Sequence, residues 1–319
     1  MSEGPLDAER IKRAIVDLEG LLTSPLLLSP SALATLGVER GERVGSALSV
    51  VSEERVEAWR LVLSRPELRP SLIKALTRSL ELFRGHRIGL YAERLICALF
   101  SALPDHQLLA HDLQVYGGAS ERQTLGALDL LIQSPRGVEH LELTVKFYLK
   151  LYNDAGWCAW LGPNERDTMA KKAHRLFAHQ LPLSERAEAQ ERLSALGLPR
   201  PAYREALCLG HLFEPISGAI DLLNPLALAK SVWVRQRQWA TVHQGAHWVT
   251  RRWVPRRYPD WLHRDRELLR LTPTLSAAQV AELPLERGRY LMLSELTEEG
   301  EEARRWMLVS DEWGVAHPP

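Results

Sequence analysis

The stretch that decides the fold runs from Gly126 to Tyr148 and contains two apolar segments, GALDLLI at 126–132 and HLELTVKFY at 140–148. In the second segment, apolar residues at 141, 143, 145 and 147 alternate with Glu142, Thr144, Lys146 and Tyr148. Strict alternation with a period of two is typical of a half-buried β-strand. Between the segments lies Ser134-Pro135-Arg136-Gly137, whose proline and glycine are typical of a turn. We therefore expect an antiparallel hairpin.

The pairing within this hairpin brings two acids together. If residues 134–137 form the turn, Gln133 pairs with Val138, and Asp129 then lies opposite Glu142. Like charges at directly opposite positions repel, because their β-carbons are only about 4.5–5.5 Å apart. A hard divalent cation such as Mg²⁺ would neutralise them, since it takes carboxylate oxygens and keeps several waters. The alternative is that both acids lie on a solvated face and bind nothing.

A third acid, Glu93, lies on a helix that we expect over residues 90–103. It falls at three- and four-residue steps in line with apolar residues, namely Leu90, Ile96, Cys97 and Phe100. Such spacing places Glu93 on the stripe that faces the core. A buried carboxylate without a partner is costly, so a metal or an ion-pair partner is expected. A buried salt bridge to an arginine is the alternative to the metal.

Around the hairpin, the chain of 319 residues divides into three parts by composition. We expect a helical N-terminal region over 1–84, a core over 85–215 with helices around one small mixed sheet, and a C-terminal region over 216–319 that is rich in Trp and Arg and then acidic. The core would contain strands near 113–116 and 207–213 and a helix over 165–181, with Asn164 as its N-cap. Mixed helices and strands of this kind predict an α/β or α+β fold.

Composition excludes several classes of protein. Forty basic residues balance forty acidic ones, so any basic patch that binds nucleic acid has to be local. The three cysteines are isolated, which argues against a disulfide framework or a cysteine-rich zinc site. The N-terminus lacks the apolar core of a signal peptide, and no apolar run approaches the 18 residues of a membrane span. We expect a cytoplasmic protein that does not associate with membranes.

A local basic region does occur between residues 230 and 270, where ten Lys/Arg residues accompany three Asp/Glu and five of the ten tryptophans. This composition is typical of a nucleic-acid surface, because bases stack on aromatic rings and cations contact phosphates. The candidate contacts there are Arg251, Arg252, Arg256 and Arg257. The alternative is that the tryptophans are buried anchors and the cations are solvated.

The order of these acids resembles the PD-(D/E)XK nuclease superfamily, in which a helix with an inward Glu precedes a strand with Gly-x-x-Asp and a strand with Glu and a nearby Lys. More narrowly, the chain resembles the bacterial family named domain of unknown function 1853. The matching segments are Ser24–Leu27, Ile88–Glu93, Thr124–Asp129, Leu141–Leu149, Leu161–Asp167, His179–Leu181 and Leu223–Pro225.

The superfamily resemblance implies a metal-dependent phosphodiesterase that acts on DNA or RNA. It also suggests that the 165–181 helix flanks the site, where Lys171, Lys172 and Arg175 would contact phosphates, and a solvated helix face is the alternative. Asp129 and Glu142 would hold Mg²⁺ or Mn²⁺, Glu93 would assist from the helix, and Lys146 would orient the attacking water or neutralise developing charge. The usual lysine follows the acid by two residues, where this chain has Thr144. Either the lysine has migrated to Lys146, or the core has lost catalysis and serves as a module that binds nucleic acid or protein.

Overall fold

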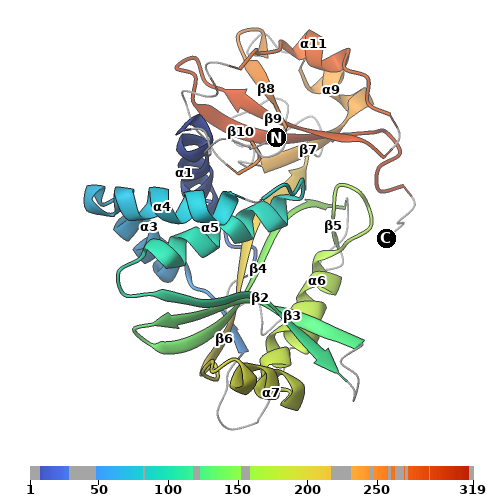
Figure 1. The fold of residues 1–319 in the computed structure, drawn as a ribbon. Helices are drawn as coiled ribbons and strands as arrows, with labels where there is room; N and C mark the ends of the chain where they lie inside the picture. The colour runs from blue at the N-terminus through green and yellow to red at the C-terminus, as the bar shows by residue number, and fades with distance from the viewer. Residues whose placement is uncertain are drawn as a thin grey trace, which may run out of the picture. The chain divides into compact units, whose positions relative to one another are not determined.

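The computed structural model of the chain describes residues 8–28, 48–81, 83–117, 123–151, 159–216, 231–243, 248–257, 260–262, 269, 272–286 and 288–315. The chain forms two compact units. Unit 1 consists of Met1–Val145 and Ala173–Gly210, and unit 2 consists of Lys146–Lys172 and His211–Pro319. Each unit combines helices with strands, as expected for an α+β protein (Figure 1). The three-part division expected from the sequence stays a prediction.

The first part of unit 1 is mostly helical, as predicted, with α1 (Ala8–Leu22), α3 (Glu53–Leu63) and α4 (Arg69–Leu80). Ile11, Ile15, Leu18 and Leu22 lie at helical spacing along α1 and are all buried. Ser52 caps α3, because its hydroxyl accepts the N–H of Arg55. A short strand that the sequence did not reveal, β1 (Leu48–Val50), follows α1 in the described chain and pairs in parallel with β6 (Tyr203–Pro215).

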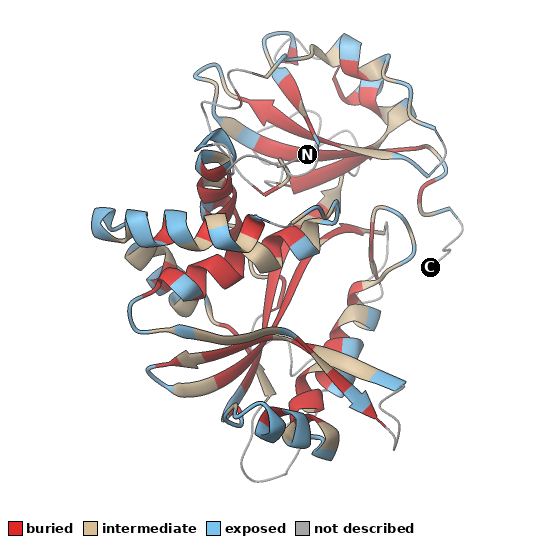
Figure 2. Ribbon diagram, in the orientation of Figure 1, coloured by how far each residue is buried: buried red, intermediate tan, exposed pale blue. Residues whose placement is uncertain are grey.

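The sheet of unit 1 has the strand order β2-β3-β4-β6, in which β2 is Gln107–Gly117, β3 is Gln123–Ser134 and β4 is Gly137–Lys150. The hairpin register is the predicted one, since Gln133 pairs with Val138 and Ser134 with Gly137. Leucines and a valine of β2 and β3 pack against α7 (Ala187–Ala195). Helix α5 (Ile88–Ala102) contacts the same two strands and is largely buried (Figure 2).

The prediction of a half-buried β4 is wrong in one respect. Its apolar face is buried, but Glu142 and Thr144 on the polar face are buried as well. The cover comes from two short helical segments, η3 (Leu176–Gln180) and η4 (Leu181–Glu185), whose side chains contact β4 through Gln180 and Ser184. Period-two alternation identifies the strand but does not reveal what covers its polar face.

The helix expected over 165–181 begins four residues later than predicted, and beyond Arg175 it continues as η3 to Gln180. Helix α6 spans Met169–Arg175, and Thr168 caps it by accepting the N–H of Lys171 at 3.2 Å. Asn164 is therefore not the N-cap. Its side chain instead accepts the N–H of Arg166 at 3.2 Å, which closes a turn in the preceding loop.

Strands β4 and β6 end within unit 2, which also contains β5 (Trp160–Leu161), β7 (Ser231–Arg235), β8 (Arg252–Arg256), β9 (Tyr290–Leu296) and β10 (Glu302–Val309). The strand order here is β7-β10-β9-β8. β10 is parallel to β7 and antiparallel to β9, so the sheet is mixed. Two short helices, α9 (Gln236–Val242) and α11 (Ala277–Ala281), pack together beside these strands.

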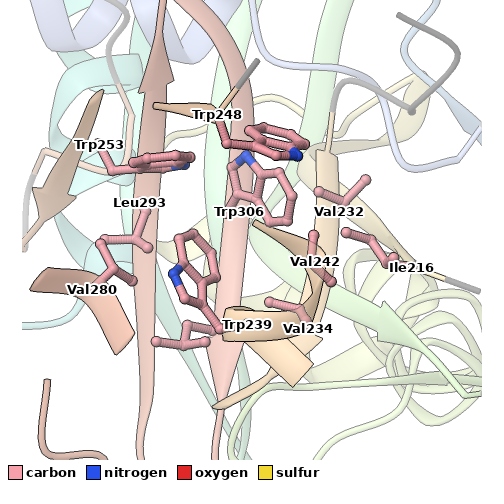
Figure 3. Packing of buried hydrophobic residues seen from close by; sticks show 11 residues of the cluster. Ile216, Val232, Val234, Trp239, Val242, Trp248, Trp253, Val280, Leu293 and Trp306 are labelled. Carbon is pink, nitrogen blue, oxygen red and sulfur yellow. The ribbon is translucent and has the colours of Figure 1, made fainter. Parts of the chain in front are cut away.

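Tryptophans form the centre of unit 2 (Figure 3). Trp239 contacts Trp253 and Trp306 with ring centroids 5.4 and 5.3 Å apart, and Trp248 completes the cluster. Trp233 is buried against Trp313. Four of the five tryptophans between residues 230 and 270 are thus buried anchors, and Trp261 is half-buried. The composition that suggested base stacking is explained for these four by core packing.

The helices in the described ranges include none that is long and apolar enough to cross a membrane.

Candidate functional site

Asp129 and Glu142 are neighbours at the point where the β3–β4 hairpin changes its hydrogen bonding. The last regular backbone pair is Leu130 with Leu141. Beyond it, the N–H of Asp129 donates to Oε1 of Glu142 at 3.4 Å, and Oδ2 of Asp129 accepts the N–H of Leu143 at 3.0 Å. The carboxylates thus take the place of backbone acceptors. The predicted cross-strand contact between the two acids is confirmed.

Glu142 is fully buried and lies among protein donors. Nε2 of His140 lies 2.8 Å from its Oε1, and Nε2 of Gln180 donates to its Oε2 at 2.5 Å. Nδ1 of the same imidazole lies 3.1 Å from the hydroxyl oxygen of Ser184, and that hydroxyl donates to the carbonyl of Leu181 at 3.5 Å. This network offsets part of the cost of burying a charged Glu142.

Sequence reasoning did not identify His140 and Ser184 as parts of the site. The alternation of β4 contained a signal for His140, because it lies two residues before Glu142 on the same strand face. Gln180 also had a signal, as a polar residue on the apolar side of its helix. Ser184 had no such signal, because its contact depends on how η4 folds back onto β4.

Asp129 has a strongly perturbed acidity. Burial, and then the nearby charges of Glu142 and Glu93, raise the pKa of Asp129 from 3.8 to about 8. Its carboxyl therefore retains a proton at neutral pH when no cation is bound. A pair of acids that resists full ionisation in this way is the electrostatic condition under which a divalent cation binds with large benefit.

Glu93 lies on the inward side of α5, as predicted, with 20% of its side chain exposed. The alternative partner expected from the sequence was an arginine, whereas Oε2 of Glu93 lies 3.8 Å from Nε2 of His111 on β2. Its charge is close enough to raise the pKa of Asp129. Nearby Cys97 is a poor nucleophile and ligand, since burial raises the pKa of its thiol to about 12.

The donor chemistry of this pair fits a hard cation. The part of the chain that the structure describes contains no group of three or more His, Cys, Asp or Glu side chains placed around one ion. Mg²⁺ nevertheless binds commonly through one or two protein carboxylates, with waters and substrate phosphates as its other ligands. Asp129 and Glu142 supply two carboxylates, and a cation beside them would offset the repulsion that raises the pKa of Asp129. Two neighbouring carboxylates are the type of donor that Mg²⁺ or Mn²⁺ takes, although His140 and Gln180 already contact the two oxygens of Glu142.

Lys146, the predicted charge-neutralising residue, has a carboxylate partner in unit 2. Its Nζ lies 2.5 Å from Oδ2 of Asp167, and the hydroxyl of Tyr148 donates to the same oxygen at 3.3 Å. Thr144, which occupies the usual lysine position, is buried. The ammonium of Lys146 would have to leave Asp167 before it could meet a phosphate.

The predicted phosphate contacts differ widely in exposure. The exposed ones are Lys171, Arg175, Arg252 and Arg257, and Lys172 and Arg251 are half-buried. Arg251 lies 3.6 Å from Glu295. The side chain of Arg256 is only 2% exposed and lies 3.5 Å from Glu302, so it cannot serve as the phosphate contact expected from the sequence. Arg252 and Arg256 lie four residues apart on the same face of β8, so alternation does not separate them, and only the segments packed around Arg256 bury it while Arg252 stays exposed.

Comparison with known protein families identifies the family of this chain. The model of the family described as "Domain of unknown function (DUF1853)" matches residues 16–311. No curated protein and no solved structure matches the chain.

Proposed function

The chain belongs to the DUF1853 family, and we propose that it is a metal-dependent, nuclease-like phosphodiesterase that acts on nucleic acid. The observation that carries the proposal is the contact between Asp129 and Glu142, in which burial and mutual repulsion raise the pKa of Asp129 to about 8. Strong perturbation of a carboxylate by a specific charged neighbour is more common at functional sites than elsewhere. The family description names no activity, so the proposal rests on this site.

The order of the acidic side chains supports a PD-(D/E)XK-like core. Helix α5 supplies Glu93, β3 supplies Asp129 three residues after Gly126, and β4 supplies Glu142. Gly126 has a φ of 155°, and a Cβ there would lie 2.9 Å from the side chain of Leu183. A glycine is therefore required close to the site, as the Gly-x-x-Asp pattern expects.

Each residue would have a definite role. Asp129 and Glu142 would hold the ion, His140 and Gln180 would keep the Glu142 carboxylate oriented, and Glu93 would add negative charge beside Asp129. When bound, Mg²⁺ would lower the pKa of a water and stabilise charge on the phosphate. Asp129 would release its proton to solvent as the ion enters, because a ligating carboxylate is ionised. Lys146 would break its ion pair with Asp167, contact a phosphate oxygen and neutralise the negative charge of the phosphate.

The decisive experiment compares wild type, Asp129→Asn and the control Asp105→Asn on labelled single- and double-stranded DNA and RNA. Asp105 is an exposed acid of the same unit, so its replacement should leave activity unchanged. We expect cleavage with Mg²⁺ or Mn²⁺ but not with chelator, and a loss of about 10²-fold or more in Asp129→Asn. Equal rates for all three proteins would contradict the proposal.

A silent module that binds nucleic acid or protein is the second candidate, favoured by two observations. Thr144 stands where a lysine is usual, and both oxygens of Glu142 already accept hydrogen bonds from His140 and Gln180. Calorimetric titration with Mn²⁺ separates the candidates, because a silent module need not bind the ion. Heat of binding in wild type and Asp105→Asn, but not in Asp129→Asn, would favour the enzyme. Binding of nucleic acid that is insensitive to chelator, without any Mn²⁺ binding, would favour the module.

A further inference from the structure

Unit 2 contains a polar pocket of about 660 Å³, lined by Asn164, Arg166, Gly288, Arg289 and Tyr290. This volume lies in the range of small-ligand sites. The lining residues combine two guanidinium groups with an amide and a phenol, and no carboxylate is among these described residues. The pocket therefore offers hydrogen-bond donors and positive charge, which suits an anion.

One wall of the pocket is a loop held by its own hydrogen bonds. The N–H of Gly162 donates to the carbonyl of Asp167 at 2.8 Å, and the side chain of Asn164 accepts the N–H of Arg166 at 3.2 Å. Glu165, between them, adopts a left-handed backbone with a φ of 59°. Lys146 and Tyr148 fix the end of the loop at Asp167. Asn164 and Arg166 are therefore presented from a well-defined backbone rather than from a free loop.

The other lining residues come from the turn that leads into β9. Gly288 has a φ of 71°, and its N–H donates to the hydroxyl of Ser310 at 3.2 Å. The N–H of Arg289 donates to the carbonyl of Glu286 at 2.9 Å, and Tyr290 begins the β9–β10 pairing opposite Val309. Both segments are thus formed before any ligand binds, which reduces the entropy lost on binding.

Binding of a ligand would break few existing interactions of the two arginines. Arg289 lies 3.9 Å from Glu286, and both side chains are more than 70% exposed, so this pair is weak. Arg166 has no ion pair with any described residue and is exposed. Guanidinium groups bind phosphate oxygens in a bidentate manner, with charge-assisted hydrogen bonds.

Tyr290 adds an aromatic component to the pocket. Its ring lies against Trp261, with centroids 5.9 Å apart, and burial raises the pKa of its phenol. The hydroxyl therefore stays protonated near neutral pH and can donate a hydrogen bond. An aromatic ring beside an amide can recognise a nucleobase, since bases stack on aromatic faces and pair with Asn side chains through their edges.

We propose that this pocket binds a nucleoside monophosphate, with Arg166 and Arg289 on the phosphate and Tyr290 and Asn164 beside the base. The ligand would be either a free nucleotide or the 5′-phosphorylated end of a strand, which share this chemistry. The pocket lies entirely within unit 2 and does not require the proposed phosphodiesterase activity.

Calorimetry on the full chain in the presence of chelator tests the pocket without the carboxylate site. We expect AMP to bind, adenosine and inorganic phosphate to bind more weakly, and Arg166→Ala and Arg289→Ala each to weaken AMP about tenfold. Arg192→Ala, an exposed arginine of unit 1, is the matched control and should leave AMP binding unchanged. Both pocket arginines are exposed, so these variants should fold, which thermal unfolding checks.

Two further ligands distinguish the sources of the nucleotide. Tighter binding of a 5′-phosphorylated oligonucleotide than of AMP, together with loss for the 5′-hydroxyl form, assigns the pocket to a strand end. Equal binding of AMP and the oligonucleotide assigns it to a free nucleotide. The proposal is overturned if AMP does not bind, if neither arginine variant weakens it, or if adenosine or inorganic phosphate binds as tightly as AMP.

Discussion

The backbone N–H of Asp129 donates to the carboxylate of Glu142 at 3.4 Å, so the two acids are joined where the regular β3–β4 ladder ends. This contact places two like charges together in a largely buried region. It explains why one member of the pair holds its proton near neutral pH. The same contact makes the stability of the protein depend on pH and on cations, and both dependences can be measured.

The first prediction concerns pH and stability without metal. The pKa of Asp129 is 3.8 in the unfolded chain and about 8 in the folded protein. Between these pH values the folded state therefore holds a proton on Asp129 that the unfolded chain has lost. The contribution of Asp129 to the free energy of unfolding therefore falls as pH rises from about 4 to about 8. Asp129→Asn should therefore gain stability relative to wild type as the pH rises. The free energy of unfolding of the variant minus that of wild type should be larger at pH 9 than at pH 4 by at least about 1 kcal/mol. Urea unfolding with chelator measures this, and Asp105→Asn should show no such trend.

The second prediction concerns the linkage between proton and metal. If Mn²⁺ displaces the proton of Asp129, its apparent affinity should rise with pH by up to about tenfold per unit and level off above pH 8. Calorimetry in two buffers of different ionisation enthalpy would also detect about one proton released at pH 7. An affinity that does not vary between pH 6 and pH 9 would place the ion away from Asp129.

The third prediction concerns the donors on Glu142. Gln180→Ala removes the hydrogen bond to Oε2 of a fully buried carboxylate, so it should lower the free energy of unfolding by about 1–3 kcal/mol at pH 7. Gln107→Ala, an exposed glutamine at the start of β2, should change it by less than about 0.5 kcal/mol. Chemical denaturation measures both, and equal effects would show that Gln180 does not support Glu142.

The fourth prediction separates core tryptophans from surface ones. Trp239 is fully buried among Trp253 and Trp306, and its indole N–H donates to the carbonyl of Ala277. Trp239→Ala should therefore cost about 3–5 kcal/mol of stability. Trp261→Ala should cost less, because that side chain is only half-buried. A Trp239→Ala protein of unchanged stability that binds nucleic acid more weakly would restore the stacking interpretation.

The fifth prediction uses the difference in exposure along β8. If this region contacts nucleic acid, replacing exposed Arg252 and Arg257 together by alanine should reduce the slope of log K against log salt by about 2, one unit for each phosphate contact. Lys74→Ala, an exposed cation on α4 of unit 1, should leave the slope unchanged. Fluorescence anisotropy from 50 to about 300 mM salt measures the slope. An unchanged slope in the double variant would assign both arginines to a solvated surface.

The sequence by itself determined the β3–β4 hairpin, its register and the inward face of the helix that carries Glu93. Alternation over 140–148 and the turn at 134–137 were sufficient to place Asp129 opposite Glu142. The alternation identifies the strand, and a turn of known position and length allows only one register between the two strands. Helical spacing likewise placed Glu93 on the inward face of α5. These are relationships between residues close together in the chain, or within one regular element.

Only the tertiary structure decided the environment of each side chain. Glu142 receives Gln180 from 38 residues away, Lys146 pairs with Asp167, and Arg256 turns into the core while Arg252 does not. Burial and hydrogen bonding depend on which distant segments pack against a strand, and no periodicity in the strand records that choice. The pKa of Asp129 also depends on the tertiary structure, because desolvation and neighbouring charges determine it only after the chain has folded.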